Sequence, residues 1–222
     1  MSLAAEFATR YAGLRQAYGT FTASNETRED GKANGKNITI SKELSDTDLL
    51  KLWEDHLSGR QSVGIVPIDE HNKCVWGAID VDEYQLDLKE LAIKIAKQKL
   101  PLVLCRSKSG GAHIYLFLTE PVTASMLQRK LRQIAAAIGY GQVEIFPKQT
   151  KLLLDRGDRG STLNMPYFGG DNSTRYAYGK DGKALTPKEF LTYTKEIELK
   201  PSTLERLEAS PLNEGLEWLD QS

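Results

Sequence analysis

Apolar residues recur along the chain at two spacings, one typical of helices and one typical of strands. Helical spacing is clearest where Leu127, Leu131 and Ile134 follow one another at intervals of three and four residues. Helices are predicted over Ala4–Tyr18, from the N-cap Ser45 through Leu57, over Leu88–Ala96, over Leu127–Ile138 and over Thr186–Lys195. Ser202 and Glu205 form the pattern of a capping box, which predicts a last helical segment interrupted near Pro211.

Shorter apolar runs between turn residues predict strands. The strands are expected at Val63–Ile68, Cys74–Val81, Leu102–Arg106, His113–Leu118 and Val143–Phe146, with extended pieces at Leu163–Phe168 and Arg175–Tyr178. Asp69–Lys73 and Ser107–Ala112 are the expected turns, and the polar stretch from Gly19 to Lys36 predicts a mobile loop within residues 19–38. Strands and helices alternate irregularly with hairpins, so the pattern favours an α+β fold over a doubly wound parallel sheet.

The composition excludes several classes of protein. The chain has 222 residues, of which 40% are hydrophobic and 27% charged, as in an ordinary globular protein rather than a disordered one. The longest apolar runs are far shorter than the roughly 18 residues of a membrane span, so no membrane partner is expected. No secretory signal opens the chain, and two cysteines provide neither a disulfide framework nor a zinc knuckle. We therefore expect a cytoplasmic protein.

The net charge of −1 conceals an uneven distribution. Residues 196–222 carry two basic and seven acidic side chains, a net −5, which leaves +4 on residues 1–195. Residues 123–160 hold seven basic and three acidic side chains. A basic stretch permits nucleic-acid binding through counterion release, although most charged faces are simply solvated.

The first candidate site is the run from Ala78 to Glu83, which ends a predicted strand. Alternate residues of a strand share a face, so Asp80 and Asp82 point the same way. Two neighbouring carboxylates repel each other unless a cation lies between them, and Mg²⁺ or Mn²⁺ prefers oxygen ligands. The pattern is also that of a strand running into a polar loop.

The second candidate is the predicted turn from Arg106 to His113. Gly110 and Gly111, flanked by serines and a lysine, would expose backbone N–H groups as phosphate-binding loops do. His113 opens the next strand and would face the same phosphates. An ordinary polar hairpin with a structural histidine is the other interpretation.

The third candidate is the strand containing Val143, Glu144 and Ile145, in which Glu144 faces away from the core. A third carboxylate on a separate strand is what a two-metal site needs beyond the first pair. Lys148 could neutralise phosphate charge. Taken alone, the pattern is also that of an edge strand with a solvated glutamate.

Together and in this order, the three candidates resemble the motifs of the archaeo-eukaryotic primase superfamily. These motifs are a hydrophobic-Asp-hydrophobic-Asp strand, a Ser-x-His-like turn and a hydrophobic-Asp/Glu strand, here Ile79–Asp82, Ser107–His113 and Val143–Glu144. Leu57–Pro67, Glu144–Gln149 and Asn164–Gly169 further resemble the prokaryotic primase-polymerases of conflict systems, plasmids and CRISPR loci. The resemblance covers roughly residues 40–195. Glu144 stands where many members have Asp, and Ser161 stands where we expect Asn.

The resemblance implies the fold and the division of the chain. It predicts an RRM-like catalytic subdomain packed against an N-terminal α/β unit, with the site between them. Residues 1–198 would form this primase-polymerase domain, and residues 199–222 an acidic helical tail or a linker to a further domain.

The resemblance also implies an activity, namely template-directed nucleotidyl transfer that makes or extends primers on single-stranded DNA from NTPs or dNTPs. Asp80, Asp82 and Glu144 would be the catalytic ligands of two Mg²⁺ or Mn²⁺ ions. The nucleotide would be bound by Arg106, Ser107, Lys108, Ser109, Gly110, Gly111, His113, Lys148 and Asn164. Template phosphates would be bound by Arg129, Lys130, Arg132, Lys151, Arg156 and Arg159. A helicase or a CRISPR-associated protein is the implied protein partner.

Three other functions remain open at this point. A single-stranded nucleic-acid-binding module would present Tyr115 and Phe117 as exposed aromatics on a sheet. A metal-dependent nuclease would need paired acids but no triphosphate-binding turn. A catalytically inactive RRM-like module of a larger replication or defence protein would bind without turnover.

Overall fold

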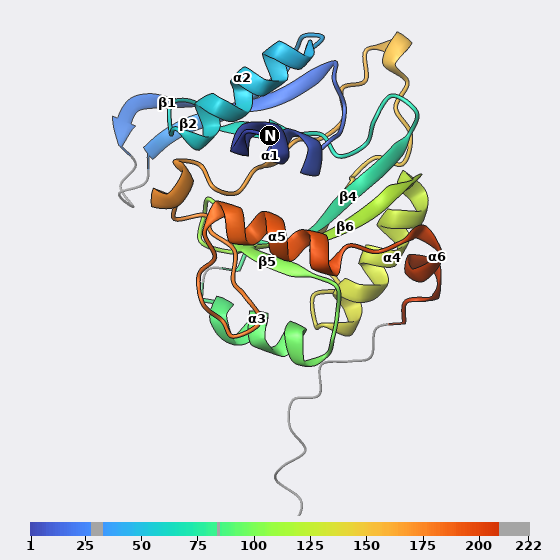
Figure 1. Ribbon diagram of the computed structural model, residues 1–222. Helices are drawn as coiled ribbons and strands as arrows, with labels where there is room; N and C mark the ends of the chain where they lie inside the picture. Colours follow the sequence, from blue (N-terminus) through green and yellow to red (C-terminus); the bar gives the residue numbers. More distant parts are fainter. Residues whose placement is uncertain (28–32, 84, 209–222) are drawn as a thin grey trace, which may run out of the picture.

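The computed structural model describes residues 1–27, 33–83 and 85–208, with the side chains of residues 22–37 left out of the description. Two four-stranded sheets form its framework, and helices pack on both faces of the second sheet (Figure 1). The helices in the described part are α1 (Leu3–Arg10), α2 (Asp46–Leu57), α3 (Leu88–Lys97), α4 (Ala124–Ala137), α5 (Pro187–Ile197) and α6 (Pro201–Arg206), with short 3₁₀ turns at Leu154–Arg156 and Gly170–Asn172. The α+β prediction is confirmed.

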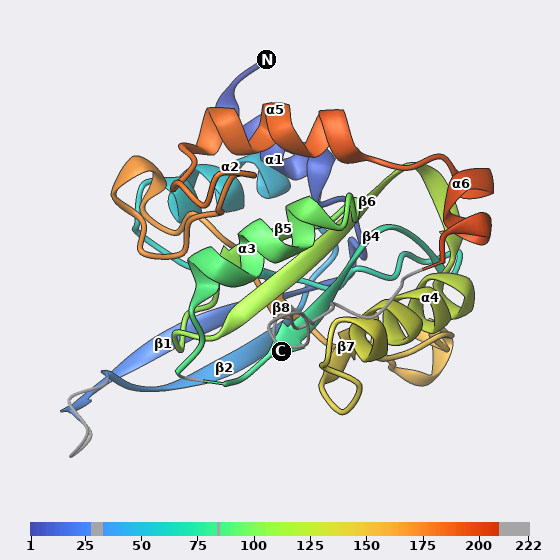
Figure 2. The same ribbon diagram turned by 90° about the horizontal axis from the view of Figure 1, so that it is seen from below.

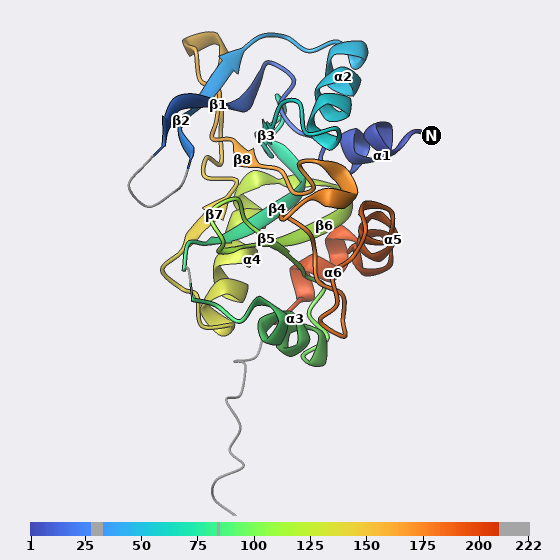
Figure 3. The same cartoon turned by 90° about the vertical axis from the view of Figure 1, so that its left-hand side faces the viewer.

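The first sheet has the strand order β2-β1-β3-β8 and is antiparallel throughout. Its strands are β1 (Ala17–Thr27), β2 (Ala33–Ser41), β3 (Val63–Ile65) and β8 (Leu163–Asn164). Strand β3 pairs with β1 only at Gly19 and Thr20, so the outer part of the β1–β2 hairpin extends beyond the rest of the sheet (Figure 3).

The second sheet has the strand order β5-β6-β4-β7, again antiparallel. Its strands are β4 (Lys73–Val81), β5 (Val103–Arg106), β6 (Ala112–Thr123) and β7 (Glu144–Phe146). Helix α3 connects β4 to β5, and α4 connects β6 to β7, so this part of the chain runs βαββαβ. Figure 2 shows α3 and α4 lying on the same face of this sheet.

The second sheet separates two hydrophobic cores because its strands alternate between two apolar faces. On one face, Ile79 and Ile114 pack against the leucines of α3 and α4. On the other, Trp76, Tyr115 and Phe117 pack with aromatic residues of α1, α2 and α5 in the core that joins the two sheets. The second face also carries the polar residues of the candidate site.

The prediction of one helix over Ala4–Tyr18 is wrong beyond Arg10, although the residues that suggested it are largely buried. Tyr11 and Leu14 reach the core from irregular backbone, where Leu14 N–H donates to the Val66 carbonyl at 3.0 Å. A side chain at Gly13 would collide with the same Val66 carbonyl. The helix therefore ends where the chain crosses residues 65–68. The helix-like spacing of Tyr11 and Leu14 reflects their burial in the core and not a continuing helix.

The mobile loop predicted within residues 19–38 is also wrong for the described residues, because they form most of β1 and β2. Residues 28–32, which come between these two strands in the sequence, lie outside the described part. The two strands pair mainly with each other, and their sequence lacks the alternation of apolar and polar residues by which strands are detected.

The C-terminal helix begins differently from the prediction. Lys200 is the N-cap of α6 and Pro201 its first residue, so Ser202 and Glu205 form no capping box. Leu204 is fully buried, and Leu199 pairs with Leu118 of β6, so residues 199–207 pack against the domain. Pro211 lies outside the described residues, and the domain boundary at residue 198 stays a prediction.

The other predicted helices and strands are found, with small shifts of their ends. Of the two extended pieces, Leu163–Phe168 is strand only at Leu163–Asn164, and Arg175–Tyr178 forms only isolated bridges at Ala177 and Tyr178. Asp69 organises the turn before β4, where its carboxylate accepts from the N–H groups of His71 and Lys73 at 2.9 and 2.7 Å. Two helices begin with capping boxes, α2 at Ser45 and α5 at Thr186. No helix in the described part of the chain is both long enough and apolar enough to span a bilayer.

Candidate active site

One row of residues crosses the second sheet and carries the candidate chemistry. Glu144 on β7 lies opposite Asp80 on β4, Asp80 lies opposite His113 on β6, and His113 lies opposite Cys105 on β5. Their neighbours two residues along on the same face, Ala78, Tyr115 and Phe146, all lie in the core between the sheets. The row therefore borders that core.

Asp80 and His113 form the buried centre of this row. Their side chains are 14% and 8% exposed, and His113 Nε2 lies 3.3 Å from Asp80 Oδ1. The other ring nitrogen, Nδ1, lies 3.2 Å from the Tyr115 hydroxyl, which fixes the plane of the imidazole. Asp80 Oδ1 is buried and has no hydrogen-bond donor with acceptable geometry among the described residues. A buried carboxylate oxygen in this state can still accept a proton donor or a cation.

Glu144 ends the row in a more open environment. Its carboxylate pairs with Lys148 Nζ at 2.6 Å, and its side chain is 60% exposed. Lys148 also lies 5.0 Å from the Phe146 ring. The third acid of the predicted motif is thus accessible, and it already has a cationic neighbour.

Asp82 follows the last residue of β4 and is exposed. Its Oδ1 lies 3.3 Å from the Ser109 hydroxyl, which can donate to it, and Ser109 in turn lies 3.2 Å from the Ser107 hydroxyl. The second predicted aspartate is therefore linked to the β5–β6 turn. This contact joins the first two sequence motifs.

The acidic residues suit a divalent cation by their chemistry. Carboxylate oxygens such as those of Asp80 and Glu144 are the ligands that Mg²⁺ and Mn²⁺ prefer, and Asp80 Oδ1, although it lies near His113, accepts no hydrogen bond within the described part of the chain. No three His, Cys, Asp or Glu side chains of the described residues already stand close enough to hold a metal. Asp80, Asp82 and Glu144 are therefore of the right type, and on the right strands, to bind a divalent cation. In this structure their carboxylates contact His113, Ser109 and Lys148, respectively.

The two glycines of the β5–β6 turn occupy positions where a side chain would be unfavourable. Gly110 has a φ of +101°, which disfavours other residues, and a side chain at Gly111 would collide with the Val81 carbonyl at the end of β4. The turn is closed by Ser107 N–H donating to the Gly111 carbonyl at 2.8 Å. This close packing holds the turn against the strand that carries Asp80.

Two predicted cations flank the turn. Arg106 extends along it, with Nη2 3.4 Å from where a Cβ of Gly110 would lie, and Nη1 3.5 Å from the Thr174 carbonyl. Lys108 reaches across to the first sheet, where its ammonium lies over the Phe21 ring of β1. Burial, together with the nearby Arg175, lowers the pKa of Lys108 to about 8.

Residues 6–197 match the model of a protein family described as the Archaeo-Eukaryotic Primase domain of the TOTE conflict system. The chain belongs to this family. No curated protein matches the chain. The protein is therefore an archaeo-eukaryotic primase domain, and at the level of the family it is primase-like and nucleotidyltransferase-like, which implies nucleic acid and nucleotides as substrates. The matched residues include all three motifs.

The primase domain places the predicted basic residues in two separate groups. Arg129, Lys130 and Arg132 lie on α4, which covers the face of the second sheet opposite to the Asp80 row. Lys130 Nζ also donates to the Leu207 carbonyl at 3.1 Å. The α4 residues are not brought together with the candidate site.

Lys151, Arg156 and Arg159 follow Lys148 on the segment that leads from β7 back to the first sheet. Within this segment the Gln149 amide fixes Ser161, donating to its Oγ at 2.8 Å and accepting from its N–H at 3.1 Å. Ser161 thus has a defined partner, although asparagine was expected there. Asn164 lies on β8, opposite Gly64 of the first sheet, and its contact with nucleotide stays a prediction.

Tyr115 and Phe117 are fully buried, contrary to what a sheet-based nucleic-acid-binding module would require. Both rings pack against Tyr11 in the core between the sheets. Neither can stack on a base, so the alternative of an RRM-type stacking surface built on these two residues is wrong.

Sequence reasoning missed Arg175, a buried residue beside the β5–β6 turn. The signal was weak, because the segment Arg175–Tyr178 was identified only as a short extended piece. A charged residue opening an otherwise apolar or aromatic extended segment is the feature that could have indicated it.

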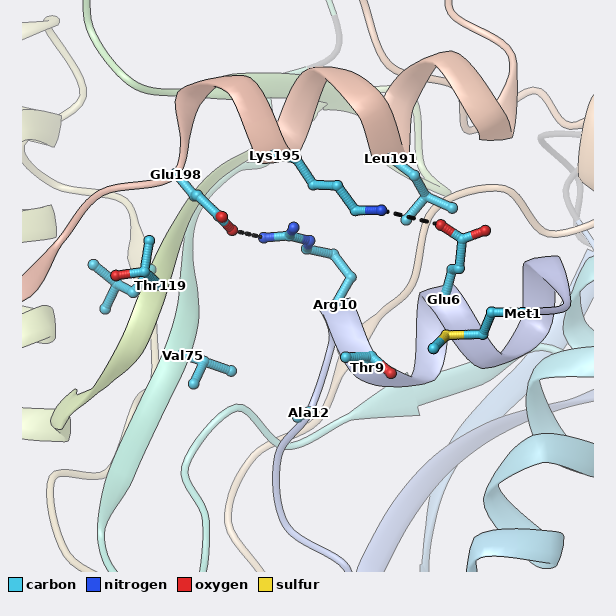
Figure 4. Close-up of a pocket in the computed structure, with 11 residues that line it drawn as sticks. Met1, Glu6, Thr9, Arg10, Ala12, Val75, Thr119, Leu191, Lys195 and Glu198 are labelled. Carbon is cyan, nitrogen blue, oxygen red and sulfur yellow. Dashed lines mark hydrogen bonds and ion pairs between the residues drawn. The ribbon is translucent and has the colours of Figure 1, made fainter.

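A separate cavity of about 540 Å³ lies at the opposite end of β4 and β6 from Asp80 and His113 (Figure 4). It lies between α1, α5 and the two strands, and two ion pairs cross it. Arg10 pairs with Glu198 at 2.6 Å, and Lys195 pairs with Glu6 at 3.2 Å. These pairs join the first and the last helix of the matched region.

Proposed function

We propose that this domain catalyses template-directed nucleotidyl transfer and makes or extends primers on single-stranded DNA. The proposal rests chiefly on one observation: Glu144, Asp80 and His113 share one row of adjacent strands, beside a turn flanked by Arg106 and Lys108. Family membership supplies the reaction class. The βαββαβ order of the second sheet supports the description of this subdomain as RRM-like.

Asp80, Asp82 and Glu144 are the proposed metal-binding residues, and primase domains of this family generally use divalent metals. Two bound Mg²⁺ or Mn²⁺ ions would supply activation of the attacking 3′-hydroxyl and stabilisation of the leaving pyrophosphate. The buried position of Asp80 gives one carboxylate with spare acceptor capacity, whereas Glu144 would first part from Lys148. Lys148 would then be free to approach phosphate.

The β5–β6 turn is the proposed triphosphate site. His113 is held by Tyr115 and points its Nε2 toward Asp80, so it can donate a hydrogen bond at the edge of the metal-binding group. Lys108 and Arg106 offset phosphate charge, and the serine hydroxyls provide further donors. The proposed nucleotide contacts are Arg106, Ser107, Lys108, Ser109, Gly110, Gly111 and His113, with Lys148 and Asn164 at the margin.

The template is proposed to run along the segment that carries Lys151, Arg156 and Arg159. This segment starts at Lys148 and returns to the first sheet, so its cations are continuous with the site. The α4 cations lie on the far layer, which makes them weaker candidates. The family description names a conflict system; a helicase or CRISPR-associated partner stays a prediction.

A primer-synthesis assay tests the proposal. The chain is incubated with single-stranded DNA, labelled NTPs or dNTPs and Mg²⁺ or Mn²⁺, with and without a primer. Asp80→Ala is compared with Asp46→Ala, since the Asp46 side chain is 98% exposed and its ion pair with Arg15 contributes little to stability. We expect product from the wild type and from Asp46→Ala, and none from Asp80→Ala.

The other outcomes discriminate among the alternatives. Synthesis by Asp80→Ala at the wild-type rate would overturn the metal-site assignment. Absence of synthesis with nucleotide binding retained would support an inactive module. Cleavage of the DNA instead of extension would support the nuclease.

A further inference from the structure

Arg175 comes directly before a short extended piece that pairs with β5 at the edge of the second sheet. Arg106 N–H donates to the Tyr176 carbonyl at 3.0 Å, Tyr178 N–H donates to the Leu104 carbonyl at 2.9 Å, and Cys105 pairs with Ala177. The row through Asp80 and His113 therefore continues to Ala177. Arg175 comes two residues before Ala177, in a bend, and the adjacent Thr174 and Tyr176 carbonyls both accept hydrogen bonds from Arg106 at the start of the β5–β6 turn.

The Arg175 side chain is buried without an anionic partner. The residue is 9% exposed, and Nη1 is buried with no hydrogen-bond acceptor. Within residues 1–27, 33–83 and 85–208, no carboxylate forms an ion pair with it. The guanidinium lies against the Phe168 ring, whose centroid is 5.0 Å from Cζ. A buried charge without a counter-charge is unfavourable, so the site favours an anion.

The backbone holds Arg175 in place before any ligand binds. Its N–H donates to Ser173 Oγ at 3.0 Å, and its carbonyl accepts from Tyr167 N–H at 3.0 Å. The position is therefore fixed by two segments at once. A guanidinium held in this way loses little freedom when it binds phosphate oxygens.

Two further cations and several free amides lie around Arg175. The like charge of Arg175 contributes to the lowered pKa of Lys108, and Arg106 bonds to the carbonyl of the adjacent residue, Thr174. In the described part of the chain, no hydrogen bond uses the N–H groups of Lys108, Ser109 or Gly111. Cations gathered around free amides are typical of phosphate-binding sites.

We propose that Arg175 binds the phosphate chain of the incoming nucleoside triphosphate, as the buried cation of a site that it forms with Arg106, Lys108 and the β5–β6 turn. This inference rests on the proposed function and adds to it a substrate-binding residue from outside the three sequence motifs. The guanidinium fork and the free amides suit a polyphosphate rather than a single carboxylate.

Calorimetric titration with inorganic tripolyphosphate, in EDTA and without metal, tests the proposal, with ATP and AMP as further probes. Arg175→Met keeps the length of the side chain and removes the charge, and Arg206→Met is the matched control on exposed α6. We expect at least tenfold weaker binding of tripolyphosphate and ATP by Arg175→Met, and wild-type binding by Arg206→Met. AMP binding should change less, because it has a single phosphate.

Thermal unfolding of the same variants separates binding from a structural role. An unpaired buried charge predicts that Arg175→Met is at least as stable as the wild type, whereas a structural cation–π contact predicts a loss. If Arg175→Met does not fold, Arg175→Lys is used instead. It retains the positive charge but lacks the paired N–H donors of the guanidinium, so it should bind tripolyphosphate several-fold more weakly. Wild-type affinity in either folded variant would overturn the proposal.

The two proposals fail in different ways. Unchanged tripolyphosphate affinity in Arg175→Met, with Asp80-dependent synthesis intact, would remove Arg175 and leave the polymerase function. Weakened tripolyphosphate binding in Arg175→Met, with no synthesis by the wild type, would support the anion site and overturn the polymerase function. Absence of tripolyphosphate and ATP binding by the wild type would overturn the phosphate site.

Discussion

Asp80 and Glu144 lie directly opposite each other on β4 and β7, yet their carboxylates contact different partners. Asp80 lies against His113 in a buried position, and Glu144 pairs with Lys148 near solvent. Like charges directly opposite in a sheet destabilise it, so this pair is a local conflict that function would explain better than folding. The conflict leads to the first prediction.

Asp80→Asn should make the metal-free protein at least as stable as the wild type, by up to about 1 kcal/mol, because it removes one of two facing charges. Added Mn²⁺ should raise the unfolding temperature of the wild type and leave that of the variant nearly unchanged. Thermal unfolding with and without Mn²⁺ measures both effects. A variant less stable than the wild type, with an undiminished response to Mn²⁺, would contradict the prediction.

Lys108 predicts a pH dependence of triphosphate binding. Its pKa is lowered to about 8 by burial and by Arg175, so the ammonium loses its proton as the pH rises through 8. The affinity for ATP should therefore fall several-fold between pH 7.5 and pH 9, whereas an ordinary lysine would stay charged over this range. Calorimetry across this range measures the change.

Lys108→Arg is the matched control, because arginine stays protonated at every pH in the series. Its affinity for ATP should be nearly constant from pH 7.5 to pH 9. An equal decline in both proteins would assign the pH dependence to another group.

His56 predicts a loss of stability in acid. Its Nδ1 accepts from Val63 N–H at 3.0 Å, and its Nε2 donates to the Pro166 carbonyl at 2.8 Å, so the ring must be neutral. Burial lowers the pKa of His56 to about 4. The unfolded chain binds this proton near pH 6.5, so stability is complete above 6.5 and falls as the pH decreases toward 4.

The expected loss from His56 alone is on the order of 3 kcal/mol between pH 7 and pH 4. Urea unfolding at a series of pH values measures it. His56→Gln cannot titrate, so its free energy of unfolding should fall less steeply over this range, even if it is lower at pH 7. Parallel pH profiles in the two proteins would refute the assignment.

The close packing of Gly111 predicts that a side chain at this position destabilises the β5–β6 turn. An alanine there would place its Cβ against the Val81 carbonyl, so Gly111→Ala should lower the free energy of unfolding by about 1–3 kcal/mol and shift the turn. Gly141→Ala is the control, since a Cβ there meets nothing closer than 3.5 Å. Urea unfolding should show a change within about 0.5 kcal/mol for the control. Equal effects at the two positions would show that the turn can move.

The sequence predicted an element best where the pattern of apolar residues within that element determines its secondary structure. The spacing of Leu127, Leu131 and Ile134 marks α4 because the helix packs one apolar stripe on a sheet. The candidate acids could be identified because each stands among apolar residues of a predicted strand, and the pairing of β4 with β7 places Asp80 and Glu144 opposite each other. Their pairing partners could not be read from local pattern.

Features decided by contacts distant in sequence were missed. Helix α1 ends at Arg10 because residues 65–68 lie across the following chain, 50 residues away. The β1–β2 ribbon lacks an apolar pattern because it pairs mostly with itself. Arg175 joins the site because the residues that follow it pair with β5, some 70 residues earlier, and the spacing of apolar residues gives no sign of such a contact.

The ion pairs between α1 and α5 have a consequence for how the domain can be carried in a longer polypeptide. Glu6 meets Lys195, and Arg10 meets Glu198, so the chain enters and leaves the matched region at one corner (Figure 4). Adjacent entry and exit points allow a unit to be inserted into a loop of a host protein without separating the host's flanking segments. A host that carries residues 6–197 in this way would also have to leave room for residues 199–207, which continue from this corner and pack on the domain.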